Sequence, residues 1–344
     1  MVQPAPGLIQ PAPAPRFSRS RSLLFAFVIV TAFFASAEGL LRLVGVRRPV
    51  RPRILLRTMD VDIEFPFMRP DPELFWAPRP GWRGVFLGKP VTINSLGLRG
   101  PEPARPKPPG SRRILCFGDS ITFGYGVADD ETYAARAGQA LASARAEVVN
   151  AGVTGYTSHQ VLRLLRRVTP AAQADVATFC IGWNDGNPRP VDDRAFARRL
   201  RAAQQVESLT EHVYLYRAMK AAYLRLLLRD APQARVPRVS PDEYADNLRA
   251  IVGECRKSGV QPVFLELPHR RRAGEPLAQS AYPDVLAAVA AEMRVPLISV
   301  GELGLRATAV SNEQYFIDTL HLSPRGHELM ARLVAEGLRR SGVL

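Results

Sequence analysis

Cysteine, histidine and lysine are all scarce in this chain of 344 residues, and each shortage excludes a class of protein. Three cysteines are too few for a disulfide scaffold. The five histidines form no H-E-x-x-H motif and no cluster with cysteine, so we predict no metal site. Only four of the 46 basic residues are lysine, and an arginine bias spread along the chain is typical of genomic composition.

The net charge of +14 is concentrated at the N-terminus. Residues 1–57 hold nine Arg and one Glu, which gives +8 there and leaves +6 for the other 287 residues. We therefore predict no nucleic-acid partner. Hydrophobic residues make up 47% of the chain, which excludes disorder throughout. At roughly 150 residues per domain, the length allows about two domains and a sizeable core.

An apolar run follows a basic, proline-rich N-terminus. We expect residues 1–21 to be a disordered basic leader. Residues 22–46 form a transmembrane anchor or a signal segment, since Leu23–Val46 would be about 36 Å long as a helix, enough to span a bilayer. Ala35-Ser36-Ala37 resembles the cleavage site of a signal peptide, so both interpretations stay open. A buried helix of a soluble protein is disfavoured because the run has no polar face.

Residues 47–110 are predicted to form a proline-rich arm and linker. Residues 48–110 contain 13 of the 30 prolines and no sustained helical period. Short extended pieces such as Val85–Leu87 and Val91–Asn94 interrupt the irregular pattern, and the tryptophans indicate a packed arm. Pro101–Gly110, with five prolines, is typical of an extended linker.

From residue 111 to 344 the pattern changes to short apolar runs, each followed by a loop and a helical period. The five predicted strands are Arg113–Phe117, Glu147–Asn150, Asp175–Ile181, Pro262–Leu265 and Pro296–Val300. The predicted helices are Thr132–Ala144, Ser158–Arg167, Pro241–Ser258, Tyr282–Met293 and Pro324–Arg340, the last capped by Ser323. Alternation of strand and helix predicts an α/β domain, a flavodoxin-like doubly wound sheet of about five parallel strands with helices on both faces.

Polar residues follow the first three predicted strands and precede the last predicted helix; in such sheets ligands bind outside the carboxyl ends of the strands. Four short segments carry them: Gly118-Asp119-Ser120-Ile121-Thr122, Asn150-Ala151-Gly152, Gly182-Trp183-Asn184-Asp185 and Asp318-Thr319-Leu320-His321. Each segment alone is an ordinary turn or helix entry. Their occurrence together, in order and each at an element end, is harder to explain structurally.

These residue types are the ones that acyl transfer to water requires. Ser120 supplies a hydroxyl nucleophile, and His321 a base whose type titrates near neutral pH. Asp318 lies three positions before His321, close enough to accept its Nδ1–H and leave Nε2 facing Ser120. The N–H groups of Ser120 and Gly152 and the side-chain amide of Asn184 are candidate donors to a developing oxyanion.

On these residues the chain resembles the SGNH (GDSL-type) serine hydrolases over about residues 112–340. Ser120, Gly152, Asn184 and His321 match the four namesake residues of that family. The resemblance implies a catalytic triad of Ser120, Asp318 and His321, an oxyanion hole of Ser120, Gly152 and Asn184, and no cofactor. Trp183 departs from the family pattern, and its bulk is expected to narrow the acyl pocket.

The arm is similar to that of a bacterial subgroup of this family with an N-terminal membrane anchor. The matching pieces are Asp71-Pro72-Glu73-Leu74 and Asn94-Ser95-Leu96-Gly97-Leu98-Arg99-Gly100. Three arginines precede the apolar run and six follow it, which by the positive-inside rule would put the bulk of the chain in the cytoplasm. The subgroup resemblance instead implies an envelope protein with a single span and an extracytoplasmic catalytic domain.

The expected function is a membrane-tethered serine esterase acting on a small acyl ester or an acylated envelope glycan. An O-acetyltransferase for a cell-surface polysaccharide is the first alternative, and a non-catalytic binding protein on the same fold is the second. An α/β-hydrolase elbow, G-x-S-x-G, is disfavoured because Thr122 occupies the position of its second glycine. Near the last segment, His327 is predicted to be a solvated helix residue. The sequence leaves the oligomeric state open.

Overall fold

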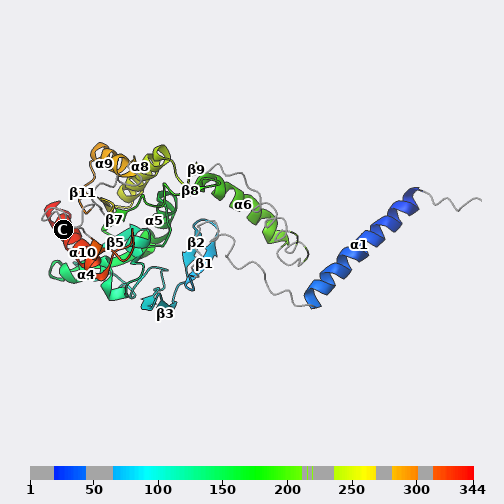
Figure 1. The fold of residues 1–344 in the computed structure, drawn as a ribbon, viewed down its shortest axis with the longest axis horizontal. Coiled ribbons are helices and arrows are strands. Elements are labelled where there is room, and N and C mark those ends of the chain that lie inside the picture. Colours follow the sequence, from blue (N-terminus) through cyan, green and yellow to red (C-terminus); the bar gives the residue numbers. More distant parts are fainter. Residues whose placement is uncertain are drawn as a thin grey trace, which may run out of the picture. The chain divides into compact units, whose positions relative to one another are not determined.

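The computed structural model describes residues 19–43, 65–210, 215, 219, 236–268, 281–300 and 313–344. The predicted leader up to residue 18 and the start of the arm up to residue 64 lie outside the described residues. The chain divides into two compact units, one made of Met1–Arg51 with Val206–Asp230 and the other of Pro52–Gln205 with Ala231–Leu344. Figure 1 names their elements.

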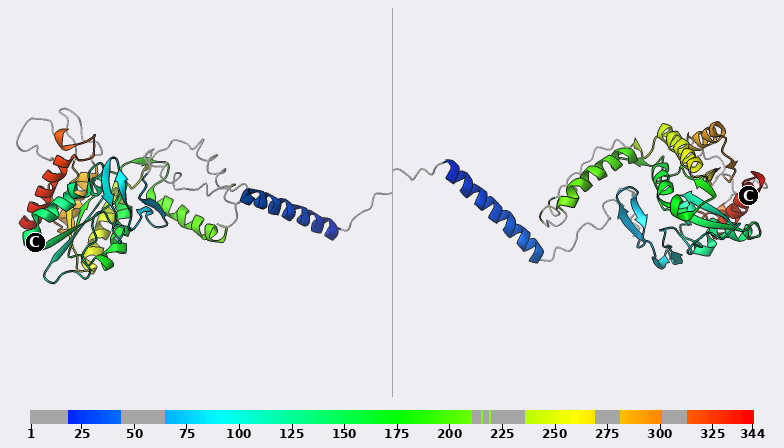
Figure 2. Two further views of the ribbon diagram at one scale, coloured as in Figure 1. Left: turned by 90° about the horizontal axis from the view of Figure 1, so that it is seen from below. Right: turned by 180° about the vertical axis from the view of Figure 1, so that it is seen from behind.

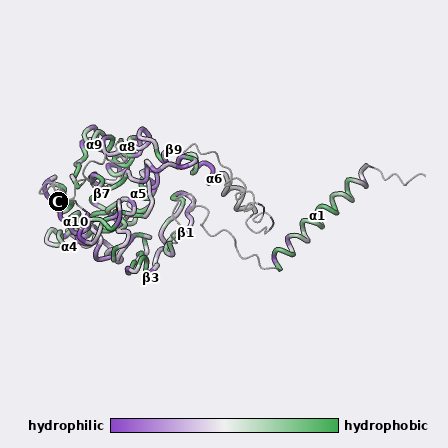
Figure 3. Tube along the Cα trace, viewed as in Figure 1, coloured by the Kyte–Doolittle hydropathy of each residue, from purple (hydrophilic) through white to green (hydrophobic). Residues whose placement is uncertain are grey.

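Helix α1 (Arg19–Leu43) belongs to the smaller unit and is apolar along most of its length (Figure 3). Its stretch Leu23–Leu43 has 21 residues, a mean hydropathy of 2.1 and no buried part, so it is long and apolar enough to cross a membrane. Glu38 and Arg42, one helical turn apart, form an ion pair with 2.8 Å between Arg42 Nε and Glu38 Oε1, so their charges cancel. A signal sequence meets the same criteria, so both interpretations of this segment remain open.

The larger unit contains the predicted parallel sheet. Its strands are β5 (Arg112–Gly118), β6 (Ala146–Gly152), β7 (Val176–Cys180), β10 (Gln261–Leu265) and β11 (Leu297–Ile298). They run parallel in the order β11-β10-β7-β5-β6. Counted along the sheet's own strands this is 2-1-3-4-5, which confirms the flavodoxin-like doubly wound prediction.

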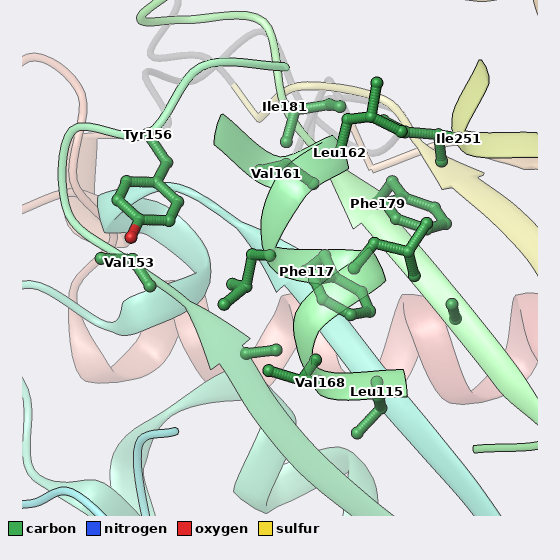
Figure 4. Close-up of a cluster of buried hydrophobic side chains, with 14 of the residues drawn as sticks. Leu115, Phe117, Val153, Tyr156, Val161, Leu162, Val168, Phe179, Ile181 and Ile251 are labelled. Carbon is green, nitrogen blue, oxygen red and sulfur yellow. The ribbon is translucent and has the colours of Figure 1, made fainter. Parts of the chain in front are cut away.

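Helices cover both faces of this sheet (Figures 1 and 2). Alternate residues of β5 point to opposite faces, as the two-residue period of a strand requires. Leu115 and Phe117 pack in the cluster that includes side chains of α5, α8 and α9, part of which Figure 4 shows. Ile114 and Cys116 pack in the cluster that includes side chains of α4 and α10. The result is three layers, helix, sheet and helix, with each strand nearly all apolar because both its faces are buried.

Five helices of this unit lie within five residues of the predicted ends, and two, Ser120–Phe123 and Asp193–Thr210, are not among the predicted helices. They are α3 (Ser120–Phe123), α4 (Tyr133–Ala140), α5 (Ser158–Ala172), α8 (Pro241–Lys257), α9 (Ala281–Met293) and α10 (Pro324–Arg340), with α6 (Asp193–Thr210) leading into the smaller unit and short 3-10 turns at Asp129–Glu131, Ala142–Ala144 and Glu313–Tyr315. Ser323 caps α10 by accepting the Gly326 N–H at 3.2 Å, with Pro324 at the first helical position, as the sequence predicts.

The described part of the arm forms two small antiparallel hairpins, β1 (Met68–Asp71) with β2 (Phe75–Pro78) and β3 (Arg83–Phe86) with β4 (Lys89–Thr92). A further short antiparallel pair joins β8 (Pro188–Arg189) to β9 (Val236–Pro237). Arm side chains such as Phe67, Leu74 and Ile93 are buried in the same hydrophobic cluster as Leu115 and Phe117 of the central strand. The arm and the sheet therefore share one core.

Candidate active site

Ser120 lies directly beyond the carboxyl end of the central strand β5. Asp119 caps the short helix α3 by accepting the Ile121 N–H at 2.9 Å, and Gly124, with φ +87°, ends it one turn later. The N–H groups of Gly124 and Tyr125 both donate to the Ser120 carbonyl at 3.0 Å. This tight turn holds Ser120 at the rim of the sheet, where it is only 5% exposed.

Ser120, His321 and Asp318 form a continuous hydrogen-bonded chain. The distance from Ser120 Oγ to His321 Nε2 is 2.9 Å, although the two residues are 201 positions apart. His321 Nδ1 lies 2.7 Å from Asp318 Oδ2, while Asp318 Oδ1 accepts the backbone N–H of His321 at 2.6 Å. With Nδ1 protonated and donating to the carboxylate, Nε2 is the acceptor that faces the serine hydroxyl.

The carboxyl group of Asp318 is held in its charged form. Partial burial alone would raise its pKa, but the backbone and ring donors of His321 and the Leu320 N–H together lower the pKa below its ordinary value. The loop also fixes the geometry of the carboxylate, since Leu320 N–H donates to Oδ1 at 2.7 Å. Asp318 is therefore an ionised, oriented partner for the imidazole.

Tyr125 contacts the other side of this arrangement, and sequence reasoning missed it. Its ring stacks on the His321 imidazole with a centroid distance of 4.3 Å and an interplanar angle of 27°. Phe86, from the β3–β4 hairpin of the arm, packs edge-on against Tyr125 at 5.7 Å. Nothing in the sequence around Tyr125 marks it, because its partner lies almost two hundred positions away.

Asn184 follows β7 and turns its side-chain amide toward the Ser120 segment. Its Nδ2 donates to Asp119 Oδ2 and to the Tyr156 carbonyl, both at 3.2 Å, and its Oδ1 accepts from Asn187 at 3.1 Å. These are long bonds, so the amide is oriented without being strongly held. Among the residues that the structure describes, the Ser120 backbone N–H donates to no group.

Gly152, which the sequence proposes as an oxyanion donor, lies at the end of β6. Its N–H donates to Asn150 Oδ1 at 2.9 Å, and the Asn150 amide in turn donates to the Thr122 carbonyl at 2.8 Å. The Gly152 hydrogen is therefore already bonded within the protein. Gly155, three residues later and with φ +79°, has an N–H that donates to no group of the described chain. The sequence holds both glycines and gives no signal to separate them.

Comparison with known proteins assigns the chain to a family. The model of the GDSL-like lipase/acylhydrolase family matches residues 116–329. The chain belongs to this family. No curated protein sequence matches it. A GDSL-like assignment supports ester hydrolysis in general.

Several solved structures have a similar fold. The crystal structure of TesA has 19% identity and a TM-score of 0.45, covering 67% of this chain and 99% of that one. The lipase/acylhydrolase from Enterococcus faecalis has the same identity and TM-score, covering 67% of this chain and 96% of its own. A catalytic mutant of Axe2, an acetylxylan esterase from Geobacillus stearothermophilus, has 18% identity and a TM-score of 0.45, covering 67% of this chain and 95% of its own.

In this GDSL-like hydrolase, the glycine at 152 is needed for close approach. A Cβ at Gly152 would lie 2.2 Å from the Phe123 backbone nitrogen and 2.6 Å from the Thr122 carbonyl carbon. Both are backbone atoms of helix α3, so they cannot move aside without shifting Ser120. The end of β6 and the turn that carries Ser120 pack together only because this position has no side chain.

Replacing Gly152 by alanine should therefore lower the free energy of unfolding by about 3 kcal/mol or more, because the new methyl group collides with main chain. Gly253→Ala is the matched control: it lies inside α8, where a Cβ meets nothing within 4 Å. There we expect a gain of about 0.5–1 kcal/mol from helix propensity. Urea unfolding of the two variants measures the difference, and equal stabilities would contradict the packing argument.

Asp185, beside Asn184, is a buried carboxyl that ties this loop to helix α5. Its Oδ1 accepts the Ser158 N–H at 3.0 Å and the Ser158 hydroxyl at 2.5 Å, while Asn247 donates to that hydroxyl at 2.9 Å. Complete burial raises its pKa from 3.8 to about 7 despite these bonds. Asp119 shows the same effect, with burial raising its pKa to about 7.

The raised pKa of Asp185 predicts a pH-dependent stability difference. Between about pH 4 and 7 the folded chain keeps a proton that the unfolded chain has released, so the stabilising contribution of Asp185 is lost as pH rises through about 7. Asp185→Asn is neutral throughout, so its Tm minus that of the natural protein should rise by about 4–8 °C from pH 4 to 8. Thermal unfolding measures it, with the exposed Asp130→Asn as control. A constant difference would refute the prediction.

His327 corrects one sequence expectation in this region. The predicted solvated helix residue is in fact fully buried, and its Nδ1 accepts the Tyr133 N–H at 3.1 Å. Burial, followed by the charges of Arg99 and His321, lowers the pKa of His327 to about 3. It is therefore a neutral core residue where α10 packs on α4.

Within the described residues, no group of three or more His, Cys, Asp or Glu could hold a metal ion.

Proposed function

We propose that this protein is a serine-dependent acyl-ester hydrolase in which Ser120 is the nucleophile, His321 the general base and Asp318 the orienting carboxylate. The supporting observation is the unbroken chain from the serine oxygen through the imidazole to the carboxylate, at 2.9 and 2.7 Å. These distances are within reach for proton transfer without rearrangement. Because Asp318 carries a lowered pKa, it stays charged and can stabilise the imidazolium that forms.

The proposed reaction has two halves. His321 Nε2 takes the Ser120 proton as Oγ attacks the ester carbonyl carbon, and the carbonyl oxygen becomes an oxyanion. The imidazolium then gives its proton to the leaving alcohol, and an acyl-Ser120 ester remains. In the second half, water attacks this ester while His321 accepts its proton. The proton passes to Ser120 Oγ as the carboxylic acid leaves, which restores the enzyme.

The proposed oxyanion donors are the Ser120 N–H, the Asn184 amide and a glycine N–H from the loop after β6. Gly152 can serve only if Asn150 releases its hydrogen, because these two are bonded to each other at 2.9 Å. Gly155 needs no such release, and its neighbour Tyr156 already accepts from Asn184. Gly155 is therefore a second candidate for the donor that the sequence assigns to Gly152.

Helix α1 supports the further proposal that the enzyme is attached to a membrane by a single N-terminal span. We propose that the catalytic domain lies outside the cytoplasm, on the resemblance of the arm to the anchored subgroup. The substrate would then be an acyl ester or an acylated glycan of the cell envelope. Transfer of an acetyl group to a polysaccharide hydroxyl shares the first half-reaction. Measuring acid release with and without a glycan acceptor separates transfer from hydrolysis.

A fluorophosphonate probe tests the proposal directly. An activated Ser120 displaces fluoride and becomes covalently phosphonylated, and peptide mapping should place the adduct on Ser120 alone. His321→Ala should react at least about 10²-fold more slowly, because the base is gone. A natural protein that stays unlabelled under these conditions would contradict the hydrolase and favour a non-catalytic binding protein on the same fold.

A further inference from the structure

We propose that Arg99, in the N-terminal arm, is a positioning residue of the active site. Its buried guanidinium fixes the segment that runs from Ser120 to Tyr125, the residue that stacks on His321. Arg99 lies outside residues 116–329, which the family model matches. The inference depends on the proposed function for the roles of Ser120 and His321, and adds a part of the chain that the family's own domain does not supply.

The guanidinium of Arg99 donates hydrogen bonds to three backbone carbonyls in the segment that follows Ser120. Nη1 donates to the carbonyls of Phe123 and Gly124 at 2.5 and 2.6 Å, and Nη2 donates to that of Val127 at 2.6 Å. The same group lies over the Phe123 ring at 4.5 Å, and the whole residue is only 2% exposed. The last carbonyls of a helix have no hydrogen-bond donor within the helix. Here one buried side chain donates the missing hydrogen bonds.

The charge of Arg99 is balanced by Asp129, which closes the same loop. Arg99 Nε donates to Asp129 Oδ1 at 2.9 Å, and Asp129 Oδ2 accepts the Thr92 N–H of strand β4 at 2.8 Å. A buried charge is tolerated when it is paired and hydrogen-bonded; this one is paired with Asp129, and each of its three guanidinium nitrogens donates at least one hydrogen bond. The carbonyl-binding group is thus anchored to both the arm and the loop.

The main chain of Arg99 is held at the edge of the sheet. Its N–H donates to the Asn150 carbonyl at 3.0 Å, next to the end of edge strand β6. The Asn150 side chain donates to the Thr122 carbonyl at 2.8 Å. Arg99 and its sheet partner therefore hold consecutive carbonyls of the short helix that begins with Ser120.

These contacts explain how the nucleophile is kept in place. Asp119 fixes the start of α3, and Arg99 fixes its end and the following turn. Tyr125 sits inside the segment that Arg99 holds, and its ring lies 4.3 Å from that of His321. One arm residue thus constrains the surroundings of both the nucleophile and the base. A misplacement of about 1 Å at such a site typically costs about 10²-fold in rate.

The test compares two buried arginines in the full-length protein. Arg113 is fully buried, pairs with Glu147 at 2.7 Å and donates to the Ala172 carbonyl at 2.6 Å, but it lies at the opposite end of β5 from Ser120. Arg99→Met and Arg113→Met should both lower Tm. Only Arg99→Met should lower kcat, by about 10²-fold, with KM changed less than about threefold. Arg99→Lys, which keeps the charge, should recover part of kcat.

Amide hydrogen exchange supplies a readout that does not need turnover. Arg99→Met should speed exchange in residues 120–127 by at least about tenfold, and Arg113→Met should leave that segment unchanged. Equal kcat losses in the two variants, or unchanged exchange in residues 120–127, would overturn the role of Arg99. If the natural protein neither hydrolyses esters nor reacts with the fluorophosphonate, the proposed function fails instead, and the exchange result still decides whether Arg99 positions this segment.

Discussion

Replacing Ser120 by alanine should lower kcat for p-nitrophenyl acetate by about 10⁴–10⁶-fold, with Tm almost unchanged. The Ser120 hydroxyl oxygen is the atom proposed to form the acyl-enzyme, and its hydrogen-bond partner is His321 Nε2 at 2.9 Å. Alanine fits the turn without strain, because the hydrogen bonds that end helix α3 are accepted by the Ser120 carbonyl and do not involve its side chain. Initial rates and thermal unfolding of the same preparation measure both quantities.

Ser111 provides the matched control for this variant. Ser111 lies just before the start of β5, whereas Ser120 lies just after the end of that strand. The Ser111 hydroxyl donates to the Pro108 carbonyl at 2.6 Å. Ser111→Ala should keep its activity. A Ser120→Ala enzyme that retains more than about a tenth of the natural rate would exclude Ser120 as the nucleophile.

Removing the Asn184 amide should lower kcat by about 10²–10³-fold and leave KM within about threefold. The two donated bonds of this amide are both 3.2 Å long in the free enzyme, to Asp119 and to the Tyr156 carbonyl. A developing oxyanion accepts a shorter, charge-assisted bond, so the amide contributes most when the transition state forms. Steady-state kinetics of Asn184→Ala measure how the effect divides between kcat and KM.

Asn247 is the comparison residue for this second variant. Its amide is also buried and donates to Ser158 at 2.9 Å, but its partners lie in the support of helix α5. Asn247→Ala should lose stability and keep kcat. A loss smaller than about threefold in kcat for Asn184→Ala would remove Asn184 from the set of oxyanion donors.

The sheet was predictable from local pattern, because buried parallel strands are short apolar runs whatever surrounds them. The capped start of α10 at Ser323 and Pro324 follows from neighbouring residues alone and is confirmed. The positions of Ser120 and Asn184 beyond the ends of β5 and β7 follow from the rule that ligands bind at that edge, whereas His321 precedes helix α10. The roles assigned to them remain predictions.

Other features of the site depend on contacts between distant segments, which periodicity does not report. Arg99 donates to carbonyls 24 to 28 positions ahead of it. The matching stretch Asn94–Gly100 marks the arm but does not say which distant backbone atoms its arginine binds. The prediction that His327 is solvated is wrong, because the burial of a helix face depends on the element that packs against it. Here that element is α4, and its Tyr133 N–H donates to His327. Whether Gly152 offers a free N–H depends on the rotamer of Asn150, which no sequence rule fixes.

The aromatic contact between the arm and the nucleophile segment has an evolutionary consequence. Phe67 of the arm stacks on Phe123, the last residue of α3, with ring centroids 5.2 Å apart and planes 14° from parallel. A recombination event that carried only residues 116–329 into a new gene would strip away half of this stack along with Arg99. The two segments should therefore be inherited together, and beneficial substitutions near Ser120 should be accompanied by compensating ones dozens of codons upstream.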